Sequence, residues 1–348
     1  MSVSQKQLLA AVALSLGAAG AVQAQSTLNA YGILDLSIGS FQLAGLDNST
    51  DNNSTTKVES GLLTTSFIGF KGTEDLGGGL KAFFTLESFM RMDTGQSGRI
   101  PAQKDDVFWA RAANVGLTGS FGKVMIGRMD NFLYQQALAF NPFGGSFGFS
   151  PTVRLTYGRW GVDKGDSGWG NSVAYYTPNL AGFTAAVQVQ PGESDAEGTS
   201  TGFMAGYANG PFAIGFGFQT VKSAEAPKAD VLSGKQTFGL LGASYDFGAA
   251  KVFAQFTKID DNTNNDKDTI YQIGVSAPVT EKLVAMASYG SLKNKDDGAA
   301  DSTSDRVLTV GVDYILSKRT DVYAAFMNNQ QTNKTSGQTF AAGIKHAF

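Results

Sequence analysis

The chain has 348 residues, a formal net charge of −3 and no cysteine, with 43 glycines and 25 phenylalanines. Its mild acidity argues against a nucleic-acid partner, which requires a clustered basic surface. Because cysteine is missing from the sequence, a disulfide framework is excluded as a source of stability.

Residues 1–24 show the features of a secretory signal peptide in the expected order. Lys6 precedes a short apolar run rich in alanine, and Val22 and Ala24 stand at the −3 and −1 positions of a cleavage site before Gln25. A buried N-terminal helix is the alternative, but it would not need these features in this order. We therefore expect residues 1–24 to be removed on export.

Beyond Gln25 the apolar residues recur with a period of two. In the segment LKAFFTLESFM, Leu80 and Ala82 share one face, while Lys81 and Thr85 lie on the other. The segment VFAQFTKI alternates less cleanly. Alternation means that each strand meets two different environments.

The hydropathy of the chain excludes transmembrane helices beyond residue 25 as the source of the apolar faces. Mean hydropathy is −0.09, and no later segment offers the ~18 uninterrupted apolar residues that a transmembrane helix needs. An exported, aromatic-rich chain with alternating strands is typical of a transmembrane β-barrel, whose apolar face meets lipid and whose polar face lines the lumen.

The connections between the strands alternate between short turns and long polar loops. The short connections are 73–79, 119–122, 178–182, 208–211, 246–250 and 317–320, and the long ones are 42–59, 93–105, 222–234, 260–268, 293–305 and 328–337. An outer-membrane barrel has short turns on one rim and long loops on the other. A β-sandwich has no reason to keep this order.

These patterns predict an all-β fold, a 16-stranded antiparallel transmembrane β-barrel. The expected strands start near residues 27, 60, 79, 106, 123, 170, 182, 200, 211, 235, 250, 268, 282, 304, 320 and 337. An even number lets the first and last strands pair, so that no open edge faces lipid. Fourteen or eighteen strands stay open as alternatives, because the boundaries near 222–236 and 260–270 are soft.

The connection over about 131–168 differs from the other loops because it is long and rich in apolar rings. Exposed rings are unfavourable in water, so we expect this segment, the constriction loop, to fold inward and narrow the lumen. A lid or receptor-binding loop on the outer rim is the alternative. The candidate site residues within this loop are Phe140, Asn141, Pro142, Phe143, Gly144, Gly145 and Phe147.

Several blocks together resemble the general diffusion porins of Gram-negative outer membranes, in particular their β-proteobacterial branch. These blocks are YGILDLSIG, FIGFKGTEDLGGGLKAFFTLE, RAANVGLTGSFGKVMIGR, NSVAYYTPNLAGF and the terminal GIKHAF. The resemblance covers the chain from residue 25 to residue 348. It implies a passive, water-filled channel for ions and small hydrophilic solutes, assembled as a homotrimer in the outer membrane in contact with lipid and lipopolysaccharide, with the third loop folded in.

The resemblance also implies a role for the C-terminus. Phe348, His346 and Ile344 lie on one face of the last strand, and in the family the terminal phenylalanine is read by the barrel assembly machinery. An ordinary last strand that ends in phenylalanine by chance is the alternative.

In the family, basic side chains on the wall face acidic ones on the constriction loop. By position, the matching residues here are Arg111 before VGL, Arg159 in YGRW and, nearer the outer mouth, Arg128 in IGR. Lys71 in GFKG is expected to face the lumen by parity. Arg154 is the other basic residue within residues 131–160. Each arginine could instead only hold the loop by hydrogen bonds.

Two departures from the family matter for selectivity. The family often has an arginine where this chain has Phe67, and residues 131–160 contain no acidic residue, although Asp130, Asp163 and Asp166 flank them. A basic constriction favours anions, so an anion preference is expected, which Glu87 could partly offset. Acidic residues are expected mainly in the outer loops, at Asp47, Asp51, Asp260, Asp261, Asp266, Asp268, Asp296 and Asp297.

The sequence offers little for catalysis or cofactor binding. His346 is the only histidine, so a hydrolase would lack its usual base, and neither an enzyme nor a cofactor is expected. Runs such as DDNTNNDKD could hold calcium, but their spacing matches no EF-hand loop. The rival functions are a channel biased toward one small organic solute, which competition with ion current would detect, and a plugged surface scaffold, which would not conduct.

Overall fold

The computed structural model describes residues 26–42, 54–99, 106–157, 166–192, 198–222, 235–262, 266–296 and 303–348. The expected signal peptide and the expected positions of Asp47, Asp51, Arg159, Asp163 and Asp297 lie outside these residues. In the described part, no helix is long and apolar enough to cross a membrane.

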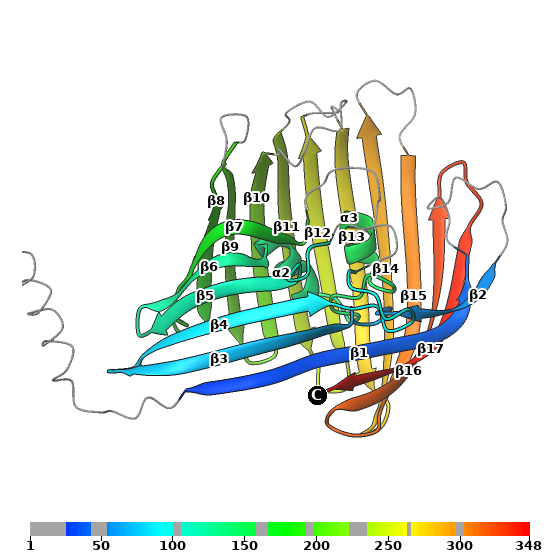
Figure 1. Cartoon of the computed structure of the whole chain (residues 1–348). Helices are drawn as coiled ribbons and strands as arrows, with labels where there is room; N and C mark the ends of the chain where they lie inside the picture. Colours follow the sequence, from blue (N-terminus) through cyan, green and yellow to red (C-terminus); the bar gives the residue numbers. More distant parts are fainter. Residues whose placement is uncertain are drawn as a thin grey trace, which may run out of the picture.

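The strands form a single sheet in which each strand is antiparallel to its neighbours (Figure 1). The strands are β1 Thr27–Phe41, β2 Thr55–Ser60, β3 Phe67–Gly77, β4 Leu80–Phe89, β5 Ala112–Gly119, β6 Gly122–Asp130, β7 Gly168–Tyr176, β8 Phe183–Gln190, β9 Ser200–Asn209, β10 Phe212–Lys222, β11 Lys235–Asp246, β12 Lys251–Asp261, β13 Asp266–Pro278, β14 Leu283–Asp296, β15 Thr303–Ile315, β16 Thr320–Gln331 and β17 Gly337–Ala347.

The sheet closes into a barrel because its first strand pairs with its last. The β1–β17 register runs from Ile33 opposite Ala347 to Phe41 opposite Thr339. Both β2 and β3 pair with β1 along its other edge, so together they form one interrupted strand. The barrel therefore has sixteen strands, as the sequence predicts.

The interruption between β2 and β3 was not expected, because the second strand was predicted to run on from residue 60. Residues 61–66 instead leave the ladder, and we call them the inner bend. Leu63 in this bend is buried in the main apolar cluster together with Phe41. Strand β5, the fourth strand of the barrel, also differs, since it begins at Ala112 and not near 106. It follows a turn in which the Ala110 amide donates to the Val107 carbonyl over 3.0 Å.

The outer face of the barrel carries the apolar side chains that a lipid environment requires. On the last strand, Phe340, Ile344 and the terminal Phe348 are all exposed on this face. His346 shares the face and lies 2.9 Å from the Thr320 hydroxyl. The predicted alternation of the C-terminus is therefore present, with the apolar row directed outward.

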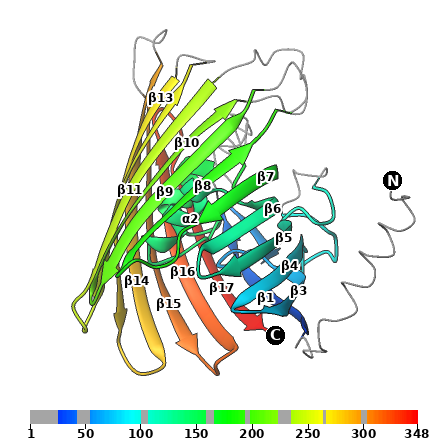
Figure 2. The same cartoon turned by 90° about the vertical axis from the view of Figure 1, so that its left-hand side faces the viewer.

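The connection between β6 and β7 folds into the barrel, as predicted for the constriction loop. It contains two short helices, α2 Phe132–Ala139 and α3 Pro151–Tyr157. Figure 1 shows both helices, and Figure 2 shows α2, enclosed by the strands. Helix α2 packs against β9, β10 and β11, and α3 packs against β13, β14 and β15.

This arrangement makes part of the lumen wall apolar, which strict alternation does not predict. We call the following set the apolar inner wall: Phe238, Leu240, Ile259, Ile270, Leu292, Val307 and Met327, on strands β11 to β16. These side chains form one cluster with Leu133, Phe143 and Phe149 of the constriction loop. Fully burying a side chain of this size contributes about 1.5–3 kcal/mol, so the wall binds the loop through many small contributions.

The fit between loop and wall predicts a sharp difference between two glycines of β11. A Cβ at Gly242 would lie 2.3 Å from Phe140 Cδ2, whereas a Cβ at Gly239 meets no atom within 4 Å. Gly242→Val should therefore lower the free energy of unfolding by about 1–3 kcal/mol through overpacking. Gly239→Val is the matched control and should have a smaller effect. Thermal unfolding in detergent, followed by circular dichroism, measures both, and equal effects would contradict this packing.

Candidate constriction of the barrel

The constriction loop is closed at its base by hydrogen bonds between its two ends. The Asn131 side chain accepts from the Tyr134 amide over 2.8 Å and so caps α2, as short polar residues commonly do. Its amide group also donates to the Asp166 carbonyl over 2.5 Å, and its backbone NH donates to the Ser167 carbonyl over 2.9 Å. The loop thus leaves and rejoins the wall at one point.

Polar groups of the wall bind the loop from the opposite side of the barrel. The Gln255 side chain donates to the Ala137 carbonyl near the end of α2 over 3.0 Å. The Thr152 hydroxyl of α3 donates to Gln272 Oε1 over 2.7 Å. These bonds satisfy buried groups that would otherwise be costly, and they fix the two helices relative to β12 and β13.

The segment Phe140–Phe147, which contains the candidate site residues of the constriction loop, is a compact turn. Asn141 Oδ1 accepts from the Phe143 amide over 2.9 Å, and Asn141 Nδ2 donates to the carbonyls of Ala137 and Gly144 over 2.6 and 2.8 Å. Phe140 and Phe143 are buried, so their rings bind the turn to the wall. The turn is therefore held by its own asparagine as well as by its aromatic residues.

Arg111 and Glu87 meet on the part of the wall that faces the constriction loop. Arg111 Nε lies 3.1 Å from Glu87 Oε2, and the Tyr31 hydroxyl donates to the other oxygen of Glu87. The Arg111 guanidinium rests over the Phe67 ring at 4.2 Å and near the Phe89 ring at 5.7 Å. Phe67 occupies the position where the family often has an arginine. In this chain its ring instead packs against the guanidinium of Arg111.

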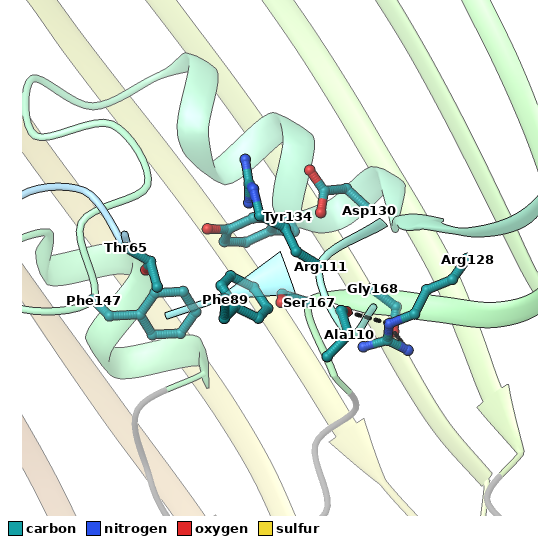
Figure 3. Close-up of a pocket in the computed structure, with 10 residues that line it drawn as sticks. All are labelled: Thr65, Phe89, Ala110, Arg111, Arg128, Asp130, Tyr134, Phe147, Ser167 and Gly168. Carbon is teal, nitrogen blue, oxygen red and sulfur yellow. Dashed lines mark hydrogen bonds between the residues drawn. The ribbon is translucent and has the colours of Figure 1, made fainter. Parts of the chain in front are cut away.

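Figure 3 shows the small pocket that Arg111 and Phe89 share with the base of the constriction loop. It is lined by Thr65, Phe89, Ala110, Arg111, Arg128, Asp130, Tyr134, Phe147, Ser167 and Gly168. The lining comes from the inner bend, from the wall and from both halves of the loop. Arg111 is therefore placed where wall and loop approach each other.

A second charged group holds the base of the loop, where Asp166 lies beside Asn131. Arg99 Nη1 lies 2.5 Å from Asp166 Oδ1, and Arg99 Nη2 lies 2.9 Å from Asp106 Oδ1. Arg128 Nη2 lies 2.5 Å from Asp166 Oδ2, and Arg128 also donates to the Ala110 and Gly168 carbonyls. We call the four charged residues Arg99, Asp106, Arg128 and Asp166 the outer ion cluster.

The cluster shifts the pKa of Asp166. Burial alone would raise the pKa of this carboxyl, but the charges and hydrogen bonds of Arg99 and Arg128 outweigh burial, so the pKa is lowered below its ordinary value. Asp166 is therefore ionised at neutral pH and neutralises part of the charge of Arg128.

The other predicted basic residues have different surroundings. Arg154 of α3 donates to the Phe147 and Gly148 carbonyls over 3.1 and 3.4 Å, and burial lowers the pKa of its guanidinium to about 10, so it stays charged at neutral pH. Lys71 lies over the Tyr31 ring at 4.2 Å. Lys71 is thus close to the Arg111–Glu87 pair, whereas Arg154 holds the loop's own backbone.

The prediction that the acidic residues between 260 and 268 lie in an outer loop is wrong for four positions. Asp260 and Asp261 end β12, and Asp266 and Asp268 begin β13, because these strands extend further than predicted. Asp261 and Asp268 are buried. Asp261 accepts from Gln236 over 3.0 Å and Asp268 accepts from Asn294 over 2.7 Å.

Sequence reasoning missed three residues that organise this site. Tyr31 and Arg99 were not singled out, and Asp166 was noted only as a flanking acid. Inward parity in YGILDLSIG could have identified Tyr31, since Tyr31 shares a face with Asp35. Nothing local in the sequence marks Arg99, because its partners Asp106 and Asp166 come from other parts of the chain.

A closed sixteen-stranded barrel, apolar outside and narrowed from within by its own charged and aromatic loop, defines a transmembrane channel of the porin class. The family model described as Gram-negative porin matches residues 9–334. The chain therefore belongs to the Gram-negative porin family.

Individual relatives agree with this assignment. Outer membrane porin protein 32 of Delftia acidovorans is 31% identical, with 98% of this chain and 95% of the relative covered. An outer membrane porin protein of Bordetella pertussis is 27% identical, with 99% and 100% covered. Among solved structures, the anion-selective porin from Comamonas acidovorans has a TM-score of 0.77 and 28% identity, covering 93% of this chain and all of that chain.

The protein is therefore an outer-membrane porin of a Gram-negative bacterium. Its homologues are porins, which are passive channels and not enzymes. Among the described residues, no group of three or more His, Cys, Asp or Glu is placed to hold a metal ion.

The outer ion cluster predicts a pH-dependent contribution to stability. Asp166→Asn leaves two partly buried guanidinium groups with fewer partners, so it should lower the free energy of unfolding at pH 7 by about 1–3 kcal/mol. A carboxyl whose folded pKa is lowered stabilises the fold above its ordinary pKa of about 3.9 and loses this effect as the pH falls further. The difference between wild type and Asp166→Asn should therefore be constant from about pH 7 to 5 and shrink below about pH 4.

Denaturant unfolding in detergent at several pH values measures this difference. Glu281→Gln, which removes one charge in an exposed turn, is the control and should show neither effect. A difference that grows on acidification would contradict the assigned direction of the Asp166 pKa.

Proposed function

We propose that this porin prefers anions and that Arg111 is the main determinant of the preference. Within the described residues, the only ion-pair partner of Arg111 is Glu87, which approaches at Nε. The side chain of Arg111 is 26% exposed and that of Glu87 only 13%, so the bore meets the cation of the pair more than the acid. This exposure is the observation that carries the proposal.

The charged residues around the Arg111–Glu87 pair also favour anions in the bore. Lys71 adds a second cation on the adjacent strand, over the Tyr31 ring. The buried carboxylates Asp261 and Asp268 lie on the far strands β12 and β13 and accept hydrogen bonds from carboxamides. At ~0.15 M salt the Debye length is ~8 Å, so an ion in the bore responds mainly to the charges closest to it.

The comparison with known proteins adds support. One similar solved structure is described as an anion-selective porin. Arg159, which lies outside the described residues, would add a further positive charge at the loop in this proposal. Arg128 contributes less, because Asp166 pairs with it directly.

The proposed biological setting follows from the same family. Residues 1–24 act as a cleaved signal peptide, and residues 25–348 form the porin barrel. The barrel assembly machinery reads the C-terminal Phe348, His346 and Ile344, and the mature protein carries small ions and hydrophilic solutes. We propose a homotrimer embedded in lipid and lipopolysaccharide, with an apolar groove on the outer wall as the subunit contact, lined in part by Leu36, Ile38, Val58, Val322, Ala342 and Ile344.

The charge on Arg111 and Glu87 should control ion selectivity in opposite directions. Two unit charges 4 Å apart interact by about 1 kcal/mol in water, so Arg111→Gln should lower the anion-to-cation permeability ratio about fivefold. Glu87→Gln keeps an acceptor for Tyr31 but removes the acid, so it should raise the ratio. Reversal potentials across a salt gradient in planar bilayers measure both changes.

Lys282→Gln is the matched control, since it removes one positive charge in an exposed turn between β13 and β14. It should leave the reversal potential unchanged. A cation-selective wild type, or the same direction of change for Arg111→Gln and Glu87→Gln, would refute the proposal.

A further inference from the structure

Asp35 is a buried carboxylate on the inner face of β1 that ion selectivity does not use. Its side chain is fully buried, and its carboxylate accepts three hydrogen bonds. Oδ2 accepts from the amides of Leu63 and Thr64 over 2.8 and 2.7 Å, and Oδ1 accepts from the Tyr323 hydroxyl over 2.6 Å. A buried acid with every oxygen engaged joins the inner bend to β16.

The backbone of Asp35 holds both ends of the inner bend as well. The Gly61 amide donates to the Asp35 carbonyl over 2.9 Å. The Asp35 amide donates to Ser66 Oγ over 2.9 Å, and Ser66 Oγ donates back to the Asp35 carbonyl over 3.1 Å. The bend is therefore attached to Asp35 at its start, at its centre and at its end.

The inner bend in turn contacts the constriction loop through one carbonyl group. The Leu62 carbonyl accepts from Ser146 Oγ over 2.6 Å and from the Gly148 amide over 3.2 Å. A Cβ at Gly148 would lie 2.6 Å from this carbonyl oxygen, so only glycine permits the approach. The amides bound by Asp35 belong to the next two residues of the bend, and they fix where the Leu62 carbonyl points.

Tyr323 provides a second route from Asp35 to the loop. Its hydroxyl binds Asp35, while its ring packs edge-on against Phe149 with centroids 6.4 Å apart and planes at 77°. Phe149 is fully buried in the cluster that joins loop and wall. The orientation of one aromatic ring thus depends on the same carboxylate.

We propose that Asp35 is a positioning residue for the constriction loop, acting through the inner bend and through Tyr323. It does so by accepting hydrogen bonds, and its charge is not required. Thr65 of the bend lines the pocket that contains Arg111, so the bend reaches both the loop and the charged wall. Loss of Asp35 therefore lets the loop leave its open position and occlude the bore.

Two variants of Asp35 distinguish the effect of its hydrogen bonds from the effect of its charge. Asp35→Leu removes all acceptors and leaves the Leu63 and Thr64 amides unpaired. At a fixed applied voltage, the ratio of closed to open time in single-channel records should rise about tenfold, the change that follows from about 1.4 kcal/mol. Asp35→Asn keeps an acceptor for the two amides and a donor for the Tyr323 oxygen, so it should stay within about twofold of wild type.

Two milder variants test the separate routes if Asp35→Leu does not assemble. Ser146→Ala removes one bond to the Leu62 carbonyl, and Tyr323→Phe keeps the ring on Phe149 but removes the hydroxyl. Each should raise the closed-to-open ratio about threefold, the effect of losing part of one hydrogen bond. Neither variant changes a charge, so the reversal potential should stay at the wild-type value.

Asp321→Leu is the matched control. Asp321 lies on β16 two residues before Tyr323 and pairs with Lys345 over 2.6 Å, on the adjacent strand β17 and not on the inner bend. This variant should leave closure near the wild-type level. The proposal is overturned if Asp35→Asn closes as often as Asp35→Leu, if Asp321→Leu matches Asp35→Leu, or if Ser146→Ala and Tyr323→Phe close no more often than wild type.

Discussion

The burial of apolar side chains between the constriction loop and one side of the lumen wall is the constraint on which the other features depend. A loop of this composition would be unstable in water, and a fully polar lumen would offer it no partner. The apolar inner wall on β11 to β16 resolves both problems by continuing the loop's apolar surface. The helices of the loop consequently pack against β9 to β11 and β13 to β15, whereas Glu87 lies on β4 and Arg111 directly precedes β5.

The same constraint determines how the polar groups are used. Where loop and wall meet, polar groups that hold the loop have specific partners, as with Gln255 and the Ala137 carbonyl. Asp35 and Asp166 hold the loop at two distant places, one through the inner bend and one through arginines. The anchoring cations Arg99 and Arg128 are thus paired with Asp106 and Asp166, and the side chain of Arg111 is more exposed than either of them.

Much of the barrel was predictable because alternation and turn spacing are local properties. The starts predicted near 200, 235 and 320 agree with β9, β11 and β16, and the terminal row ending in Phe348 faces outward as expected. The inner bend was not predictable, since GLLTTS has the composition of a continuing strand. The strand ends near Asp261 and Asp268 were missed because DDNTNNDKD is polar throughout, and polarity alone does not distinguish a protruding strand from a loop.

The apolar inner wall could not be predicted from the sequence for a different reason. In TFGLLGAS, both Leu240 and Leu241 are apolar, since one faces the loop and the other faces outward. A strand covered on both faces loses the period of two, and which strands the loop covers is a property of the tertiary fold. The irregular alternation of VFAQFTKI has the same cause, because Phe253 and Ile259 are buried on the inner face.

The most direct test of the account is a crosslink between the constriction loop and the inner wall. A Cβ at Gly274 would lie 2.6 Å from Pro142 Cδ and 2.9 Å from Pro142 Cγ, so these two residues of wall and loop are in direct contact. The natural chain has no cysteine. Oxidised Pro142→Cys/Gly274→Cys should form the disulfide in folded protein that still conducts, whereas Pro142→Cys/Gly239→Cys should not. Absence of the first crosslink from conducting protein would contradict a loop bound inside the bore.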